Sequence, residues 1–123
     1  MDKYDEARAP ETTPERLAEL SRDNDPDVRA GVAWNTSAPQ ELLIELSRDE
    51  YPNVRRGVAV NTSAPQELLV ELSRDVEWVV RAGVAWNTSA PISILTLLTK
   101  DEDDDVVKAA QETLATRSRS TFA

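Results

Sequence analysis

The chain contains neither cysteine nor histidine among its 123 residues. The absence of cysteine excludes disulfides and thiolate-bound zinc or iron–sulfur centres. The absence of histidine removes the side chain that most often serves as a general acid or base near neutral pH. We also recognise no nucleophile–base pair, metal-ligand cluster or phosphate-binding loop. The sequence therefore predicts a protein that is not an enzyme and that carries no cofactor.

Long apolar segments and an excess of positive charge are lacking as well. No apolar run approaches the roughly 20 residues of a membrane span, and the acidic residues 1–6 do not resemble a signal peptide. We therefore expect a cytoplasmic location and no membrane partner. The formal net charge of −9 disfavours broad contact with a phosphate backbone, so nucleic acid is an unlikely partner on composition.

A 26-residue repeat dominates what is present. Residues 46–71 read LSRDEYPNVRRGVAVNTSAPQELLVE, and the same frame starts again at Leu20 and Leu72. A period of this length is typical of solenoids, in which neighbouring units share one elongated core. We expect a flexible lead-in over residues 1–10, one repeat domain over residues 11–116 and a flexible tail over residues 117–123.

Each repeat predicts two short helices. The first is expected to begin at a capping serine such as Ser37, with Gln40 completing a capping box and leucines forming one apolar face. The second is expected over residues 26–34 and at the equivalent positions, with valines four apart on a shared face. It should end at an asparagine (Asn35, Asn61 or Asn87), because asparagine tolerates the left-handed conformation. The incomplete first unit, residues 16–20, aligns with the others only if one residue is missing.

Gly31, Gly57 and Gly83 are the only glycines, and all three occupy one mid-helix position. Glycine there costs roughly 1 kcal/mol relative to alanine. We therefore predict that a neighbouring unit approaches too closely for a Cβ atom.

The frame LSRDxxxxVRxGVAxNTSAPQELL resembles the repeat of the leucine-rich-repeat variant family, over residues 12–114. The resemblance implies a right-handed superhelix of alternating α- and 3₁₀-type helices without a β-sheet, and does not by itself decide which helix of each pair is the 3₁₀ one. The fold predicted is therefore an all-α, right-handed α-solenoid of about four two-helix repeats.

An aspartate and an arginine six residues later recur in three units, as in HEAT repeats, where these residues form a ladder between units. In the fourth unit Val107 takes the arginine position after Asp101, so we expect the ladder to end there. The recurrence of the pair favours a structural role over binding of a substrate group. The predicted structural ladder comprises these pairs and the asparagines: Asp23, Arg29, Asp49, Arg55, Asp75, Arg81, Asn35, Asn61 and Asn87.

The positions that vary between units are the candidates for binding. Trp34, Val60 and Trp86 share one register, with the outer two about 20 Å apart if helices stack 8–10 Å apart. Each tryptophan either lies exposed as a contact residue or packs over its neighbour as core. The apolar loop around Trp78 either forms a contact site or folds into a local core. The full candidate interaction surface is Ala30, Trp34, Tyr51, Arg56, Val60, Trp78, Ala82 and Trp86.

These features predict a non-catalytic scaffold that binds an unidentified protein or peptide, because tryptophan and arginine are enriched at binding hot spots. The alternative is a HEAT-like module that binds nucleic acid. In that case a line of cations, Arg22, Arg48, Arg74 and Lys100, would contact the phosphates.

Overall fold

A computed structural model of the chain describes the backbone of residues 1–122 and the side chains of residues 1–119. Within residues 1–122 the chain forms nine α-helices and no strand, which confirms the all-α prediction for this part. None of these helices is both long and apolar enough to cross a bilayer. The helices are α1 (Lys3–Arg8), α2 (Pro14–Leu20), α3 (Pro26–Trp34), α4 (Gln40–Leu46), α5 (Pro52–Val60), α6 (Gln66–Leu72), α7 (Trp78–Trp86), α8 (Ile92–Leu98) and α9 (Asp104–Phe122).

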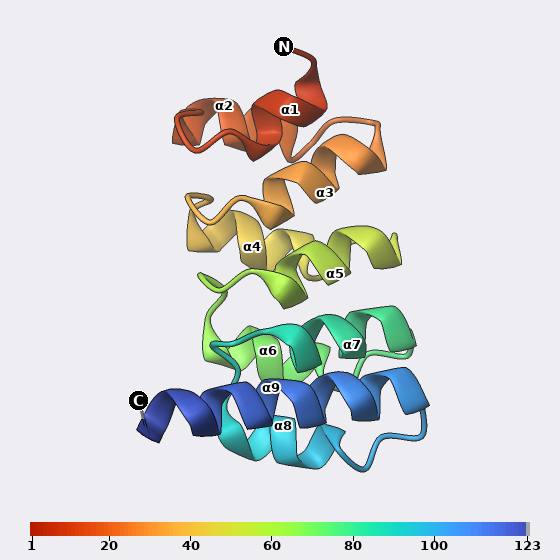
Figure 1. The fold of residues 1–123 in the computed structure, drawn as a ribbon. Helices are drawn as coiled ribbons and strands as arrows, with labels where there is room; N and C mark the ends of the chain where they lie inside the picture. Colours follow the sequence, from red (N-terminus) through yellow and green to blue (C-terminus); the bar gives the residue numbers. More distant parts are fainter. Residues whose placement is uncertain (123) are drawn as a thin grey trace.

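The helices lie in two columns (Figure 1). The first column consists of α1, α3, α5, α7 and α9, each packed against the next. The second consists of α2, α4, α6 and α8, each of which contacts the first-column helices before and after it. Valines of the first column and leucines of the second, such as Val58 and Leu69, are fully buried between the columns. Each column therefore supplies one apolar face of a shared core.

The first-column helices begin where the sequence restricts the backbone. Pro26 and Pro52 occupy the first turn, where the missing N–H costs no intrahelical hydrogen bond. At α3 the side chain of Asp25 also accepts a hydrogen bond from the N–H of Asp27. Helices α3, α5 and α7 end with Asn35, Asn61 and Asn87 as their C-caps.

The predicted beginnings of the second-column helices were wrong. Helix α4 begins at Gln40 rather than at Ser37, and its N-cap is Pro39, which makes no side-chain capping bond. Residues 35–38 instead form a turn in which the N–H of Ala38 donates to the Asn35 carbonyl at 3.0 Å. The N–H of Ser37 donates to the Asn35 Oδ1 atom at 2.8 Å, and the serine belongs to this turn, three residues before the helix begins.

The predicted left-handed asparagine was also wrong. Asn61 has φ −76° and ψ 117°, which is extended backbone, and no residue in the described part of the chain, glycines included, has a positive φ. The reason for asparagine at this position is its side chain, described below.

Residues 1–10 differ from the expected flexible lead-in. Residues 3–8 form α1, which packs against α3 with Ala7 fully buried. Helix α1 lies 26 residues before the second half of α3, so it is a shortened first-column helix of an additional unit. Helix α2 also precedes α4 by 26 residues, so the alignment that omits one residue was wrong.

The C-terminal segment and the helix type depart from expectation as well. Helix α9 continues through the first part of the predicted tail as far as Phe122, and residue 123 lies outside the described residues. Both helices of each repeat are α-helical, and the described residues contain no 3₁₀-helix. The alternation of helix types implied by the family resemblance is therefore not found here.

The prediction of close approach at the glycines is confirmed. A Cβ atom on Gly57 would lie 2.7 Å from the Ala33 Cβ atom, and one on Gly83 would lie 2.9 Å from that of Ala59. The first-column helices can therefore pack this closely only with glycine facing alanine.

Candidate interaction surface

Asparagine side chains join each unit to the one before it. Asn61 is 2 % exposed, and its Nδ2 atom donates to the carbonyls of Ala33 at 2.8 Å and Asn35 at 3.0 Å. Its Oδ1 atom accepts a hydrogen bond from the N–H of Ser63 at 2.8 Å. Asn35 and Asn87 repeat this arrangement. The asparagines thus satisfy buried carbonyls at the C-terminal ends of the preceding helices, and their role is structural.

Arginine–aspartate pairs form a second set of connections between units. The Nε atom of Arg29 donates to Asp49 at 2.8 Å, and Arg55 and Arg81 pair with Asp75 and Asp101 in the same way. Each arginine also donates from Nη1 to the backbone carbonyl of the aspartate in its own unit, as Arg29 does to Asp23 at 2.8 Å. Each arginine therefore pairs with the carboxylate of the next unit and donates to the backbone of its own unit.

Pairing shifts the pKa values of the three arginines and of Asp75. The hydrogen bond that Arg29 donates to Asp49 raises the pKa of Arg29 despite its desolvation. Burial alone would raise the pKa of Asp75, but the hydrogen bonds from Arg55 and from the Glu77 N–H outweigh it, so the pKa is lowered. Both shifts favour the charged forms. The ladder is therefore charged and satisfied, and it offers little to a ligand.

Lys3 forms the first rung of this ladder, which the sequence analysis missed. Its Nζ atom lies 2.9 Å from the Asp23 carboxylate. Lys3 precedes Arg29 by 26 residues and therefore occupies the arginine position of the repeat.

The variable residues gather on the outer face of the first column. Three positions of each first-column helix share this face, which on α5 are Asn53, Arg56 and Val60, at i, i+3 and i+7. Residues at these positions and their neighbours line two separate hollows. The first, of about 410 Å³, is lined by Tyr4, Asp25, Asp27, Ala30 and Trp34. The second, of about 430 Å³, is lined by Asn53, Arg56, Trp78, Val79, Ala82, Trp86, Asp105, Lys108 and Glu112.

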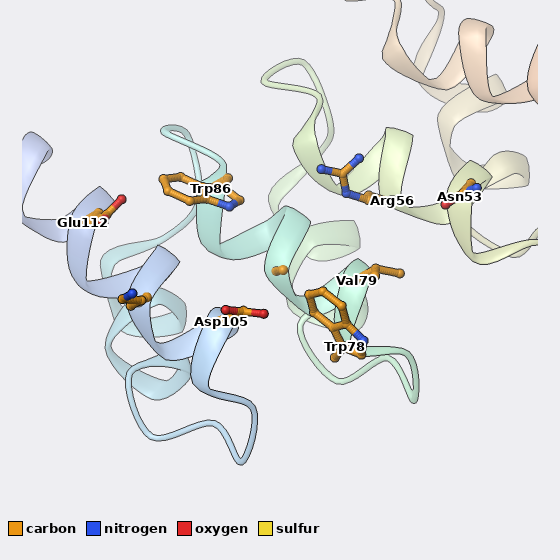
Figure 2. Close-up of a pocket in the computed structure, with 9 residues that line it drawn as sticks. Asn53, Arg56, Trp78, Val79, Trp86, Asp105 and Glu112 are labelled. Atoms are coloured by element: carbon orange, nitrogen blue, oxygen red, sulfur yellow. The ribbon is translucent and has the colours of Figure 1, made fainter.

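The second hollow, hereafter the α7 hollow, lies over α7 between α5 and α9 (Figure 2). Trp78 and Trp86, from the two ends of α7, are 43 % and 50 % exposed. Ala82, halfway between them, is almost fully buried. Arg56 lines the hollow from α5, and Asp105 and Glu112 line it from α9. The tryptophans thus present aromatic surface to solvent around a small residue.

Trp34 is both packed and exposed. Its Cδ1 atom would lie 3.2 Å from a Cβ atom on Gly57, yet the residue is 41 % exposed. The guanidinium of Arg56 lies over the indole, 5.8 Å from the ring centroid. Val60 packs over Gly83 in the same way and is partly buried. The side chain at the Trp34 position therefore packs on the glycine of the next unit on one side and is exposed to solvent on the other.

Tyr51 lies apart from the tryptophans. It precedes α5, is 46 % exposed, and has the Arg29 guanidinium 5.5 Å from its ring centroid. It lines a different hollow, next to the arginine–aspartate ladder. The structure therefore does not bring all the predicted surface residues together.

The α9 wall of the α7 hollow is what sequence reasoning left out. Asp105, Lys108 and Glu112 were not among the candidates, nor was Asn53 on α5. Lys108 and Glu112 continue the registers of Ala82 and Trp86, as the repeat predicts. Asn53 and Asp105 share a register three residues earlier in each helix, which was not included in the candidate surface. The expected stripe comprised the registers of Ala30 and Trp34, whereas the face also includes the register of Asn53, Val79 and Asp105.

The four cations predicted as an alternative contact line, Arg22, Arg48, Arg74 and Lys100, are all exposed and make no ion pair in the described structure. The aspartate beside each one is held in the ladder.

The described residues contain no cluster of three or more acidic side chains placed to hold a metal ion. No family model matches the chain, and neither a curated protein nor a solved structure matches it.

Proposed function

We propose that the chain is a short, right-handed α-solenoid of the leucine-rich-repeat variant type, acting as a non-catalytic scaffold that binds a protein or peptide. The observation that carries this proposal is the α7 hollow, whose two tryptophans stand about half exposed. Exposed tryptophans around a recess resemble the centre of a protein interface, where aromatic residues supply most of the binding free energy.

The residues that connect the units support this role, because they fix the first-column helices without occupying the variable outer face. Asparagine and arginine ladders and glycine–alanine contacts position the first-column helices through residues that are buried or already paired. A rigid face keeps the entropy cost of binding low. The 26-residue repetition, the packing of α1, α3, α5, α7 and α9 in one series, and the resemblance of the repeat support the solenoid assignment.

The test is capture of partners from cells that express the protein. Trp86→Ala should remove a partner that the wild type retains. Ile44→Ala should leave that partner bound, because Ile44 is an exposed apolar residue on the second column. If every captured protein is retained equally by wild type and by Trp34→Ala and Trp86→Ala variants that remain folded, the proposal is wrong.

Nucleic acid is a second candidate, favoured by one observation. The aspartates beside Arg22, Arg48, Arg74 and Lys100 are engaged in the ladder, so the four exposed cations keep their charge available. Neutralising four phosphates gives a slope of log Kobs against log salt of about −3 to −4. A gel shift at low salt that disappears on replacing these residues by glutamine would support this function, whereas no shift at low salt excludes it.

A further inference from the structure

The α7 hollow has an apolar floor of defined length. Trp78, Ala82 and Trp86 lie four residues apart and therefore share one face of α7. At 1.5 Å per residue, the two tryptophans are separated by about 12 Å along the helix axis. Ala82 carries only a methyl group between them. The floor therefore has room for one large apolar side chain held between two indoles.

The two walls of the hollow carry opposite net charge. On α5 the only charged lining residue is Arg56. On α9 the lining residues Asp105, Lys108 and Glu112 sum to one negative charge. A ligand that crosses the hollow from α5 to α9 thus passes from a positive wall to a net negative one.

Arg56 is in place to receive an anion. It is half-buried, and it makes no ion pair in the described structure, although the preceding residue, Arg55, is paired with Asp75. Its guanidinium is held over the Trp34 ring at 5.8 Å. Stacking on an aromatic face leaves the edges of the guanidinium available for a carboxylate. The arginine is therefore positioned without being neutralised.

We propose that the α7 hollow binds an extended protein segment with an acidic, an apolar and a basic side chain at alternate positions. This inference rests on the proposed function and names its partner. The apolar side chain lies on Ala82 between the indoles, the acidic one pairs with Arg56, and the basic one faces the net negative wall of α9. Alternate residues of an extended chain point to the same side, and residues i and i+4 are about 13 Å apart. That span suits a crossing between helices two places apart in a column, once the side chains reach inward.

The test uses synthetic peptides and the indole N–H signals of the protein. Three capped peptides with phenylalanine at the centre carry glutamate and lysine, two glutamates, or two lysines at the flanking alternate positions. In ¹H–¹⁵N spectra of the full chain at low salt, the mixed peptide should shift the Trp78 and Trp86 signals. The other two should bind about threefold more weakly, which corresponds to one exposed ion pair.

Charge reversal at Arg56 supplies the decisive comparison. Arg56→Glu makes both walls negative, so the peptide with two lysines should become the tightest binder. Arg22→Glu is the matched control, because it changes the net charge equally at an exposed site outside the α7 hollow. It should leave the order of the three peptides unchanged. If the ¹H–¹⁵N spectrum shows that Arg56→Glu disturbs the fold, Arg56→Gln serves instead. It should abolish the advantage of the mixed peptide over the one with two lysines.

The inference is wrong if no peptide shifts the Trp78 and Trp86 signals at millimolar concentration, or if the Arg56 variants keep the wild-type order. In either case a cellular partner that still depends on Trp86 would leave the proposed scaffold function intact. Failure of the inference and failure of the proposed function are thus separated.

Discussion

Replacing Gly57 by alanine sets a gain in helix propensity against a steric overlap. Alanine in mid-helix is favoured over glycine by about 1 kcal/mol. The new Cβ atom would lie 2.7 Å from the Ala33 Cβ atom and 3.2 Å from the Ala30 carbonyl oxygen. Neither contact is with a flexible side chain, so α5 would have to move away from α3. Overpacking of this kind costs about 1–3 kcal/mol, and we expect a net loss in the free energy of unfolding of about 1 kcal/mol.

A double-mutant cycle with Ala33→Gly separates the two contributions. Removing the Ala33 Cβ atom relieves the shortest contact, so Gly57→Ala should be less destabilising in the Ala33→Gly background by about 1–2 kcal/mol. Urea unfolding followed by far-UV circular dichroism gives the free energy of unfolding of the wild type, both single variants and the double variant. Ala115→Gly, at an exposed site of α9, measures the change in helix propensity alone. If Gly57→Ala stabilises the protein by the full propensity gain and the two sites show no coupling, the close approach does not explain the glycine.

Asp75→Asn should lower the free energy of unfolding at pH 7 by about 1–3 kcal/mol, because it removes the carboxylate that accepts two hydrogen bonds from Arg55. The lowered pKa of Asp75 makes this contribution present above the ordinary value of 3.8 and lost as the pH falls through the folded-state pKa. The difference from wild type in urea unfolding should therefore shrink as the pH is lowered below 3.8, and a difference that stays constant would contradict the assignment. Deleting residues 1–9 removes both carbonyls that accept from Asn35. It should cost about 1–3 kcal/mol, seen as a lower Tm by calorimetry, and an unchanged Tm would show that α1 is not part of the stack.

The repeat predicted the helices well because the residues that pack each unit on the next recur at the same positions. Valines and leucines at fixed registers identified the buried faces, and Gly57 identified the close approach. Where the sequence of a unit differs from the others, the repeat positions predict its helices less well. In residues 1–10 only Ala7 and the basic character of Lys3 preserve the frame, and two residues are too few to identify α1.

Local propensity misled the prediction at the asparagines. Asparagine is common at left-handed helix ends, but Asn61 has extended backbone and donates to two carbonyls of the preceding unit. Such bonds join residues 26 and 28 positions apart, and no local pattern reveals them. Whether Trp86 is exposed or buried was equally inaccessible, because it depends on how far Ala82 and the α9 side chains leave the indole uncovered.

The central claim is that each repeat separates a fixed frame from a variable face, and the adjacent residues Trp86 and Asn87 test it most directly. Trp86→Arg should cost about 1 kcal/mol in the free energy of unfolding, because the residue is 50 % exposed and an arginine stem can cover much of the rest. Asn87→Ala should cost about 3 kcal/mol, because it removes three hydrogen bonds to buried or partly buried backbone groups. Urea unfolding of the two variants side by side supports the separation if Asn87→Ala is clearly the more damaging. An equal or greater loss for Trp86→Arg would contradict it.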